Sequence, residues 1–228
     1  EDGLPIWDLG RRVAPAVGLP LLLLAGLVLF GSLQRPEEIL QSARAAWLEE
    51  ADADLAARRY RKFVRRFNEH PLASDARVEL ASLVAGQLEQ PVQAARLLEV
   101  AAKNQPTHAE AGEWLLLAAD IASGAGHARW AERLWTRVAD VHPAQASTAL
   151  LNMARERIAQ GDPAGAYADY QRVALDRATP EEIALARIGM SICLERLGDR
   201  DAALAELETL SESDAGWRQR REALIGRR

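Results

Sequence analysis

The chain has 228 residues, of which 49% are hydrophobic but only 5% aromatic, and its net charge is -5. Alanine and leucine supply most of the apolar content, which suits helices and leaves few of the residues that strands prefer. The charge balance gives no reason to expect nucleic acid as a partner. A single cysteine, Cys193, excludes an internal disulfide. We therefore expect an all-α protein.

An uncharged apolar stretch, residues 13–33, follows a short N-terminal tail, residues 1–12. As a helix this stretch would span roughly 31 Å, which matches the hydrocarbon core of a bilayer. A cleaved signal peptide is the alternative, but the apolar core of a signal peptide is usually shorter. We therefore expect a single transmembrane helix over residues 13–33.

The charges that flank this segment set its expected orientation. Arg11 and Arg12 precede it and Arg35 and Arg44 follow it, so the two sides carry equal numbers of positive charges. The adjacent pair at the N-terminal boundary, with Glu37 and Glu38 on the other side, decides between the two orientations. Positive charges favour the cytoplasmic side, so the sequence predicts an N-terminus inside. In a bacterium the chain would then be a single-pass protein of the inner membrane with a periplasmic body.

Helical periodicity continues from residue 36 to the end, interrupted at regular intervals by glycine and proline. A small residue followed four positions later by a large one recurs at Ala56/Tyr60, Ala94/Leu98, Ala131/Trp135, Ala166/Tyr170 and Ala203/Leu207. The number of residues from one such pair to the next is typical of a repeated helix-turn-helix unit. One helix pair cannot bury its apolar stripe alone, so we expect about five pairs to stack as a solenoid.

The most regular unit lies at residues 150–173. Gly161 should end its first helix, and Asp162 can cap the second. Pro163 then falls in the first turn, where proline is tolerated. The sequence therefore predicts a turn between two helices at Gly161 to Pro163.

The units resemble the tetratricopeptide repeat (TPR) family. In the third unit the resemblance rests on Trp114, Leu117, Ala118, Ile121, Ala131, Trp135 and Pro143. Alanine and isoleucine stand where the family has glycine and tyrosine, and the second helix follows one residue later than the family spacing. The resemblance covers residues 36–213, and residues 214–228 are expected to form a capping helix. With the expected anchor, the chain is similar to membrane-anchored TPR proteins of the bacterial envelope.

First helices of TPR proteins line a groove that binds peptide segments, and the resemblance implies such a groove here. Carried over by position, it comprises Glu79, Leu80, Leu83, Leu115, Leu116, Ala119, Leu151, Asn152, Arg155, Ile188 and Ile192. The alternative is that Leu115 and Leu116 only pack against neighbouring repeats. We call these eleven residues the predicted groove.

A cluster of cations surrounds an apolar stripe in the first unit. It comprises Arg58, Arg59, Arg61, Lys62, Arg65 and Arg66, which we call the basic patch. One interpretation is a solvated face whose alkyl stems cover the core. The other is a docking patch for anionic lipid or an acidic partner.

Signatures of catalysis are absent from the sequence: there is no HExxH, no phosphate-binding glycine loop and no CxxC. The four histidines fall at expected turns, and Cys193 sits in an apolar run typical of a buried side chain. We therefore expect no catalytic residue, no cofactor, no metal and no small-molecule substrate.

The sequence predicts a membrane-anchored TPR scaffold that binds other proteins in a bacterial envelope complex. Integral membrane or periplasmic subunits are the expected partners, beside the bilayer itself. One alternative is a structural accessory subunit of a larger integral membrane machine. Another is a chaperone-like accessory that presents client proteins to a translocation or maturation enzyme.

Overall fold

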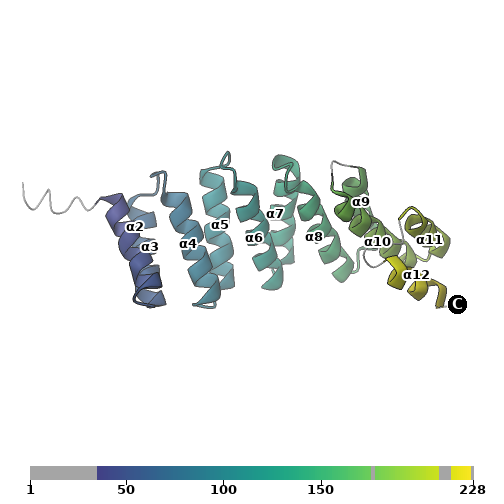
Figure 1. The fold of residues 1–228 in the computed structure, drawn as a ribbon, viewed down its shortest axis with the longest axis horizontal. Coiled ribbons are helices and arrows are strands. Elements are labelled where there is room, and N and C mark those ends of the chain that lie inside the picture. Colours follow the sequence, from purple (N-terminus) through teal and green to yellow (C-terminus); the bar gives the residue numbers. More distant parts are fainter. Residues whose placement is uncertain (1–34, 176–177, 211–216, 227–228) are drawn as a thin grey trace, which may run out of the picture. The chain divides into compact units, whose positions relative to one another are not determined.

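The computed structural model describes residues 35–175, 178–210 and 217–226, and its helices are labelled in Figure 1. Within these ranges every regular element is an α-helix, so the expected all-α fold is confirmed. The predicted tail and transmembrane helix, residues 1–33, lie outside the described residues. In the part that the structure describes, no helix is both long and apolar enough to cross a membrane.

The chain divides into two units, residues 1–63 and residues 64–228. The described part of unit 1 holds α2 (Pro36–Leu48) and most of α3 (Ala53–Arg66), whose last residues belong to unit 2. Tyr60 and Phe63 of α3 are fully buried. Arg59 Nη1 donates to the Ser42 carbonyl oxygen at 2.7 Å, which ties α3 to α2.

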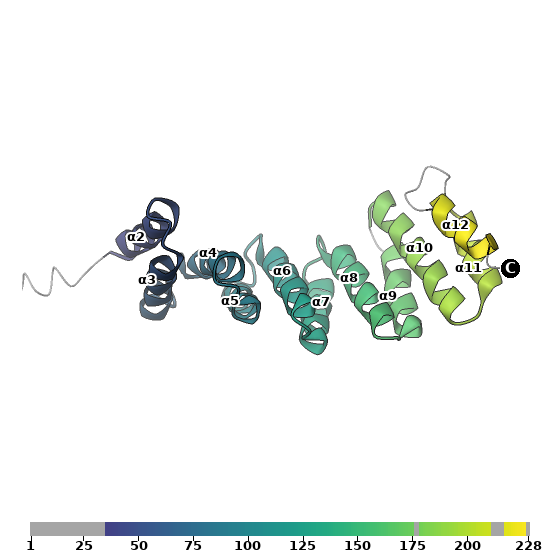
Figure 2. The same ribbon diagram turned by 90° about the horizontal axis from the view of Figure 1, so that it is seen from below.

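Unit 2 is a row of helix pairs. Its helices are α4 (Ala73–Gly86), α5 (Pro91–Asn104), α6 (Ala111–Gly124), α7 (Ala128–Val141), α8 (Ala146–Ala159), α9 (Pro163–Leu175), α10 (Pro180–Arg196), α11 (Arg200–Glu208) and α12 (Trp217–Gly226). Each helix from α4 to α11 packs on the next, and α8 also touches α6 and α10. The first helices α6, α8 and α10 therefore lie next to one another, as Figure 2 shows for α6 and α8.

The pairs of small and large residues form the core of unit 2. All members of Ala94/Leu98, Ala131/Trp135, Ala166/Tyr170 and Ala203/Leu207 are buried. The contact is closest at Gly189 of α10, where a Cβ atom would overlap the Tyr170 ring of α9. The stacked helix pairs that the repeats predict are therefore confirmed.

The helix ends show why the chain turns where it does. Gly161 has a φ of +84°, a conformation that glycine adopts without the cost of a side chain. Asp162 Oδ1 accepts from the Gly165 N–H at 2.9 Å, and α9 begins at Pro163. The turn predicted between α8 and α9 is therefore present, with the expected residues in the expected roles.

Candidate functional site

The structure separates the predicted groove into buried and accessible residues. The buried members, each at most 5% exposed, are Leu80, Leu83, Leu115, Ala119 and Leu151. Their side chains pack within the helix array. Ile188 is half-buried and packs against the cluster of Ala203 and Leu207. These six residues therefore serve packing in this structure. For Leu115 this agrees with the alternative that it only packs against neighbouring repeats.

The accessible members of the predicted groove are Glu79, Leu116, Asn152, Arg155 and Ile192. Asn152 and Arg155 lie on α8, and Leu116 lies on the adjacent α6. Whether a partner binds them stays a prediction. The residues expected at the centre of the groove are mostly core. On α6, where Leu115 and Ala119 are buried, the reason is that the first-helix motif is placed one position too early.

The burial of α6 corrects that reading. Leu117, taken as a core position of the motif, is 48% exposed, whereas Leu115, Ala118, Ala119 and Ala122 are buried. The motif therefore starts at Leu115. Ala119 then precedes Ala131 by 12 residues, the same separation as between Ala154 and Ala166 in the next unit. With this start, the second helix of the third unit no longer follows one residue later than the family spacing.

A network of polar side chains joins α6 to α8 beside Leu116 and Leu117. Asp120 Oδ1 accepts from Trp135 Nε1 at 3.1 Å and from Asn152 Nδ2 at 3.0 Å. The Asn152 Oδ1 atom in turn accepts from Arg155 Nη1 at 3.1 Å. The two bonds to Asp120 tie α6 to α7 and α8, and the third holds Arg155 against Asn152 within α8. The network therefore presents Asn152 and Arg155 in defined positions.

This network lines a recess of about 360 Å³. The residues around it are Asp120, Ser123, Trp135, Asn152, Arg155 and Glu156. Burial raises the pKa of the Asp120 carboxyl above its ordinary value, although its hydrogen bonds act in the opposite direction. The pKa of Glu156 is lowered, first by the hydrogen bond from Ser123 Oγ at 2.6 Å. We call Leu116, Leu117, Asp120, Asn152 and Arg155 the first-helix face.

Sequence reasoning missed Leu117 and Asp120 as members of this face. Their exposure follows directly from the one-residue correction to the motif, since Leu117 was assigned to the core. The signal was present in the sequence. The separation of 12 residues between small residues of the two helices recurs in the units that contain Ala131 and Ala166.

The basic patch lies along α3. Arg58 and Lys62 are exposed, whereas Arg59 is engaged with Ser42 and with Glu50 Oε1 at 3.4 Å. Arg65 and Arg66 fall in the last turn of α3, where cations complement the helix dipole. Arg61 is half-buried. A docking role for the patch stays a prediction, and Arg59 has a structural role within unit 1.

The described residues contain no group of three or more histidine, cysteine, aspartate or glutamate side chains that could hold a metal ion. Cys193 is buried, and burial raises the pKa of its thiol to about 11. Its sulfur is therefore protonated at neutral pH and is a poor nucleophile.

Comparison with solved structures places this fold among helical repeat proteins. The chain resembles MamA, with 15% identity over 78% of this chain and 93% of MamA, at a TM-score of 0.54. It also resembles BtubC (BKLC) from P. vanneervenii, with 16% identity over 84% of this chain and 90% of that protein, at 0.53. A third likeness is to TPR-like repeats of a putative kinesin light chain from Podosopora anserina, with 17% identity over 85% and 98% of the chains, at 0.52.

No protein-family model matches the chain, and no curated protein matches it in sequence. At such low identity, the likenesses to solved structures concern the fold alone. That fold is the TPR-like arrangement of stacked helix pairs.

Proposed function

We propose that this TPR-like solenoid is a non-enzymatic scaffold whose first-helix face binds a segment of another protein. The observation that carries the proposal is the exposure of Leu117, at 48%, beside an ordered polar network on α6 and α8. Binding surfaces commonly combine an apolar anchor with polar groups that fix the partner's register. The first-helix face offers both, with Leu116 and Leu117 on α6 as apolar groups and Asp120, Asn152 and Arg155 as polar groups that line the recess.

The charges of the face indicate what kind of segment fits. Arg155 is an exposed cation, and Asp120 already receives two hydrogen bonds from within the protein. The Asn152 amide and the Arg155 guanidinium are therefore the groups available to hold a partner's carbonyl or carboxylate oxygens. Leu116 and Leu117 would cover one of its apolar side chains.

The proposal includes the membrane anchor over residues 13–33. An anchored scaffold meets membrane partners at a raised effective concentration, which strengthens weak contacts. We propose a single-pass protein of the bacterial inner membrane with a periplasmic body, and integral membrane or periplasmic subunits as partners. Protease added to intact spheroplasts should then digest the body. A body protected until the membrane is broken would place it in the cytoplasm.

The test of the binding face compares two exposed apolar residues of unit 2. Leu117→Glu alters the first-helix face, whereas Val141→Glu places the same charge on α7, where Val141 is 57% exposed. The tagged full-length chain is purified in mild detergent from cells that produce it, and bound proteins are identified by mass spectrometry. We expect Leu117→Glu to lose partners that Val141→Glu retains, with equal urea midpoints for both variants.

Two outcomes would reject parts of this account. If Leu117→Glu retains every partner, the first-helix face is not the interface. If instead partners are lost equally from both variants, the effect is not specific to this face. Recovery of integral membrane proteins at fixed stoichiometry would favour a structural subunit over a transient chaperone.

A further inference from the structure

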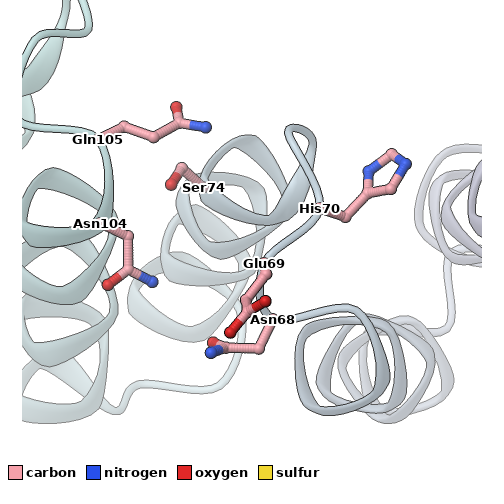
Figure 3. Close-up of a pocket in the computed structure, with 6 residues that line it drawn as sticks. All are labelled: Asn68, Glu69, His70, Ser74, Asn104 and Gln105. Atoms are coloured by element: carbon pink, nitrogen blue, oxygen red, sulfur yellow. The ribbon is translucent and has the colours of Figure 1, made fainter.

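A second surface of unit 2 lies at the turn between α3 and α4. A cavity of about 370 Å³ is lined there by Asn68, Glu69, His70, Ser74, Asn104 and Gln105. Figure 3 shows Asn68, Glu69, Ser74 and Asn104 around one space, whereas the His70 ring points away from it. The cavity joins the start of α4 to the end of α5. We call it the turn pocket.

Arg77 does not line the turn pocket itself, but its guanidinium donates a hydrogen bond to Asn68 Oδ1, and Asn68 does line it. Arg77 is three residues after Ser74 on α4, so the two side chains share one side of the helix. Arg77 is only 2% exposed. Within the described part of the chain, its one hydrogen-bond partner is Asn68 Oδ1, and its Nη1 atom is buried without a partner. A positive charge is therefore held next to the pocket by a neutral amide alone.

Such an arrangement is unusual for a buried cation. Removing a charge from water is costly, so buried charges are normally paired with an opposite charge. Two partly buried arginines of unit 2 follow this rule, since Arg157 contacts two carboxylates and Arg220 contacts Glu195. An acidic group from outside the chain would supply the counter-charge that Arg77 lacks.

We propose that the turn pocket binds one carboxylate of a partner protein, with Arg77 as its cation. Asn68 is exposed on the turn, so its side chain can rotate away and leave Nη2 and Nη1 to the incoming carboxylate. Two parallel N–H donors are the geometry in which arginine binds carboxylates most strongly. This site is separate from the first-helix face and does not depend on it.

The surroundings of Arg77 favour a carboxylate over a phosphate. No side chain caps the first turn of α4, so its N–H groups add a partial positive charge near Ser74. Glu69, however, places a negative charge at the pocket's edge. Asp75 adds a second negative charge in the first turn of α4. One buried guanidinium with two carboxylates nearby suits a monoanion, whereas a phosphate dianion would be repelled more strongly.

The test measures binding of short peptides to the isotopically labelled full-length chain by NMR. The probes are acetyl-Gly-Glu-Gly-amide, which has a side-chain carboxylate, and acetyl-Gly-Gly-Gly, which has a free chain end. Acetyl-Gly-Gln-Gly-amide is the uncharged control, and inorganic phosphate tests the rival anion. We expect one of the two acidic peptides, or both, to shift the amide signals of Ser74, Asn104 and the Asn68 side chain.

Two substitutions decide whether Arg77 is responsible. Arg77→Met should lower the peptide affinity by about tenfold or more, because it removes the bidentate donor. Asn68→Ala should raise the affinity by about threefold, because it removes the internal competitor for the guanidinium. Arg155→Met, on the first-helix face, is the matched control. Like Leu117→Glu, it should leave the peptide-induced shifts of Ser74, Asn104 and the Asn68 side chain unchanged, whatever it does to signals of the first-helix face.

The outcomes that overturn the proposal are distinct from those that reject the first-helix face. Absence of shifts with both acidic peptides, or equal shifts with the uncharged control, rejects the carboxylate site. Stronger shifts with phosphate than with the acidic peptides reject the assignment of a carboxylate. A large fall in the urea midpoint of Arg77→Met, without tighter binding by Asn68→Ala, assigns Arg77 a purely structural role.

Discussion

Two arginines on first helices of unit 2, Arg157 and Arg77, hold their charges in opposite ways. Arg157 of α8 contacts Glu132 Oε1 of α7 at 2.7 Å and Asp169 Oδ2 of α9 at 2.8 Å. It also donates to the Gly165 carbonyl oxygen at 3.3 Å. Arg77 of α4 meets only an amide oxygen among the described residues. The repeat array therefore neutralises one arginine internally and leaves the other without a counter-charge.

The difference shows how a repeat can serve packing at one place and recognition at another. At Arg157 the neighbouring helices supply both carboxylates, so the ion pairs join α7, α8 and α9. Asp169 is 3% exposed, and burial raises the pKa of its carboxyl to about 6 although Arg157 lowers it. At Arg77 the following helix supplies amides and a cavity instead. Removal of the arginine should therefore destabilise the chain strongly at Arg157 and change its stability little at Arg77.

The largest effect should come from Arg157→Met at pH 8. The substitution leaves Asp169 buried without its cation, which should lower the free energy of unfolding by about 3 kcal/mol. Arg77→Met should change it by no more than about 0.5 kcal/mol, because a buried unpaired charge contributes little to stability. Urea unfolding followed by circular dichroism measures both. Equal losses for the two variants would contradict the comparison.

The pH dependence of stability should reveal Asp169. Its pKa is about 6 in the folded chain against an ordinary 3.8, so its contribution to stability is complete below about pH 4. That contribution is lost as the pH rises through 6. Between pH 4 and pH 7 the natural chain should therefore lose about 2–3 kcal/mol relative to Asp169→Asn. Parallel curves of unfolding free energy against pH for the two proteins would show that burial does not shift Asp169.

A smaller effect is expected where α9 meets α10. Gly189→Ala places a methyl group against the Tyr170 ring and should cost about 1–2 kcal/mol through overpacking. Gly86→Ala is the matched control, since a Cβ there meets nothing within 4 Å. The control should be neutral or slightly stabilising, because alanine is the better helix former. Thermal unfolding midpoints distinguish the two, and similar midpoints would mean that α10 shifts to admit the methyl.

The smallest effect is expected at the wall of the turn pocket. Ser74 Oγ donates to the Ala101 carbonyl oxygen at 3.3 Å, which is long for a hydroxyl donor. Ser74→Ala should therefore cost only about 0.5 kcal/mol. A loss comparable to that of Gly189→Ala would show that the pocket wall is as tightly coupled to folding as the junction of α9 and α10. The measurement is the same urea titration.

The repeat architecture was predictable because its signals are local. Glycine and proline mark helix ends, and the spacing of Ala166 and Tyr170 marks a helix contact, so both are visible in the linear sequence. The predicted turn at Gly161 and Asp162 is present for this reason. The position of the motif within α6 was less certain, because this helix is apolar on several sides. Leu115 and Leu117 are then equally good core candidates, and only the packing of adjacent helices separates them.

The polar contacts could not be predicted in the same way. The bond between Asp120 and Asn152 and the ion pairs of Arg157 join residues of different helices, so they depend on how those helices stack. Arg77 appears in the sequence as one arginine among many. What distinguishes Arg77 from the other arginines is its burial without a counter-charge, and burial depends on how the helices pack.

The central claim is that the first-helix face of α6 and α8 is the surface that holds a partner. Site-specific photo-crosslinking in living cells tests it most directly, with a benzoyl-phenylalanine placed at position 117 or, as control, at position 141. Both positions are exposed, at 48% and 57%, so neither substitution should disturb packing. The account predicts a discrete crosslinked protein from position 117 and none from position 141. Adducts from position 141 alone, or from neither position, would contradict it.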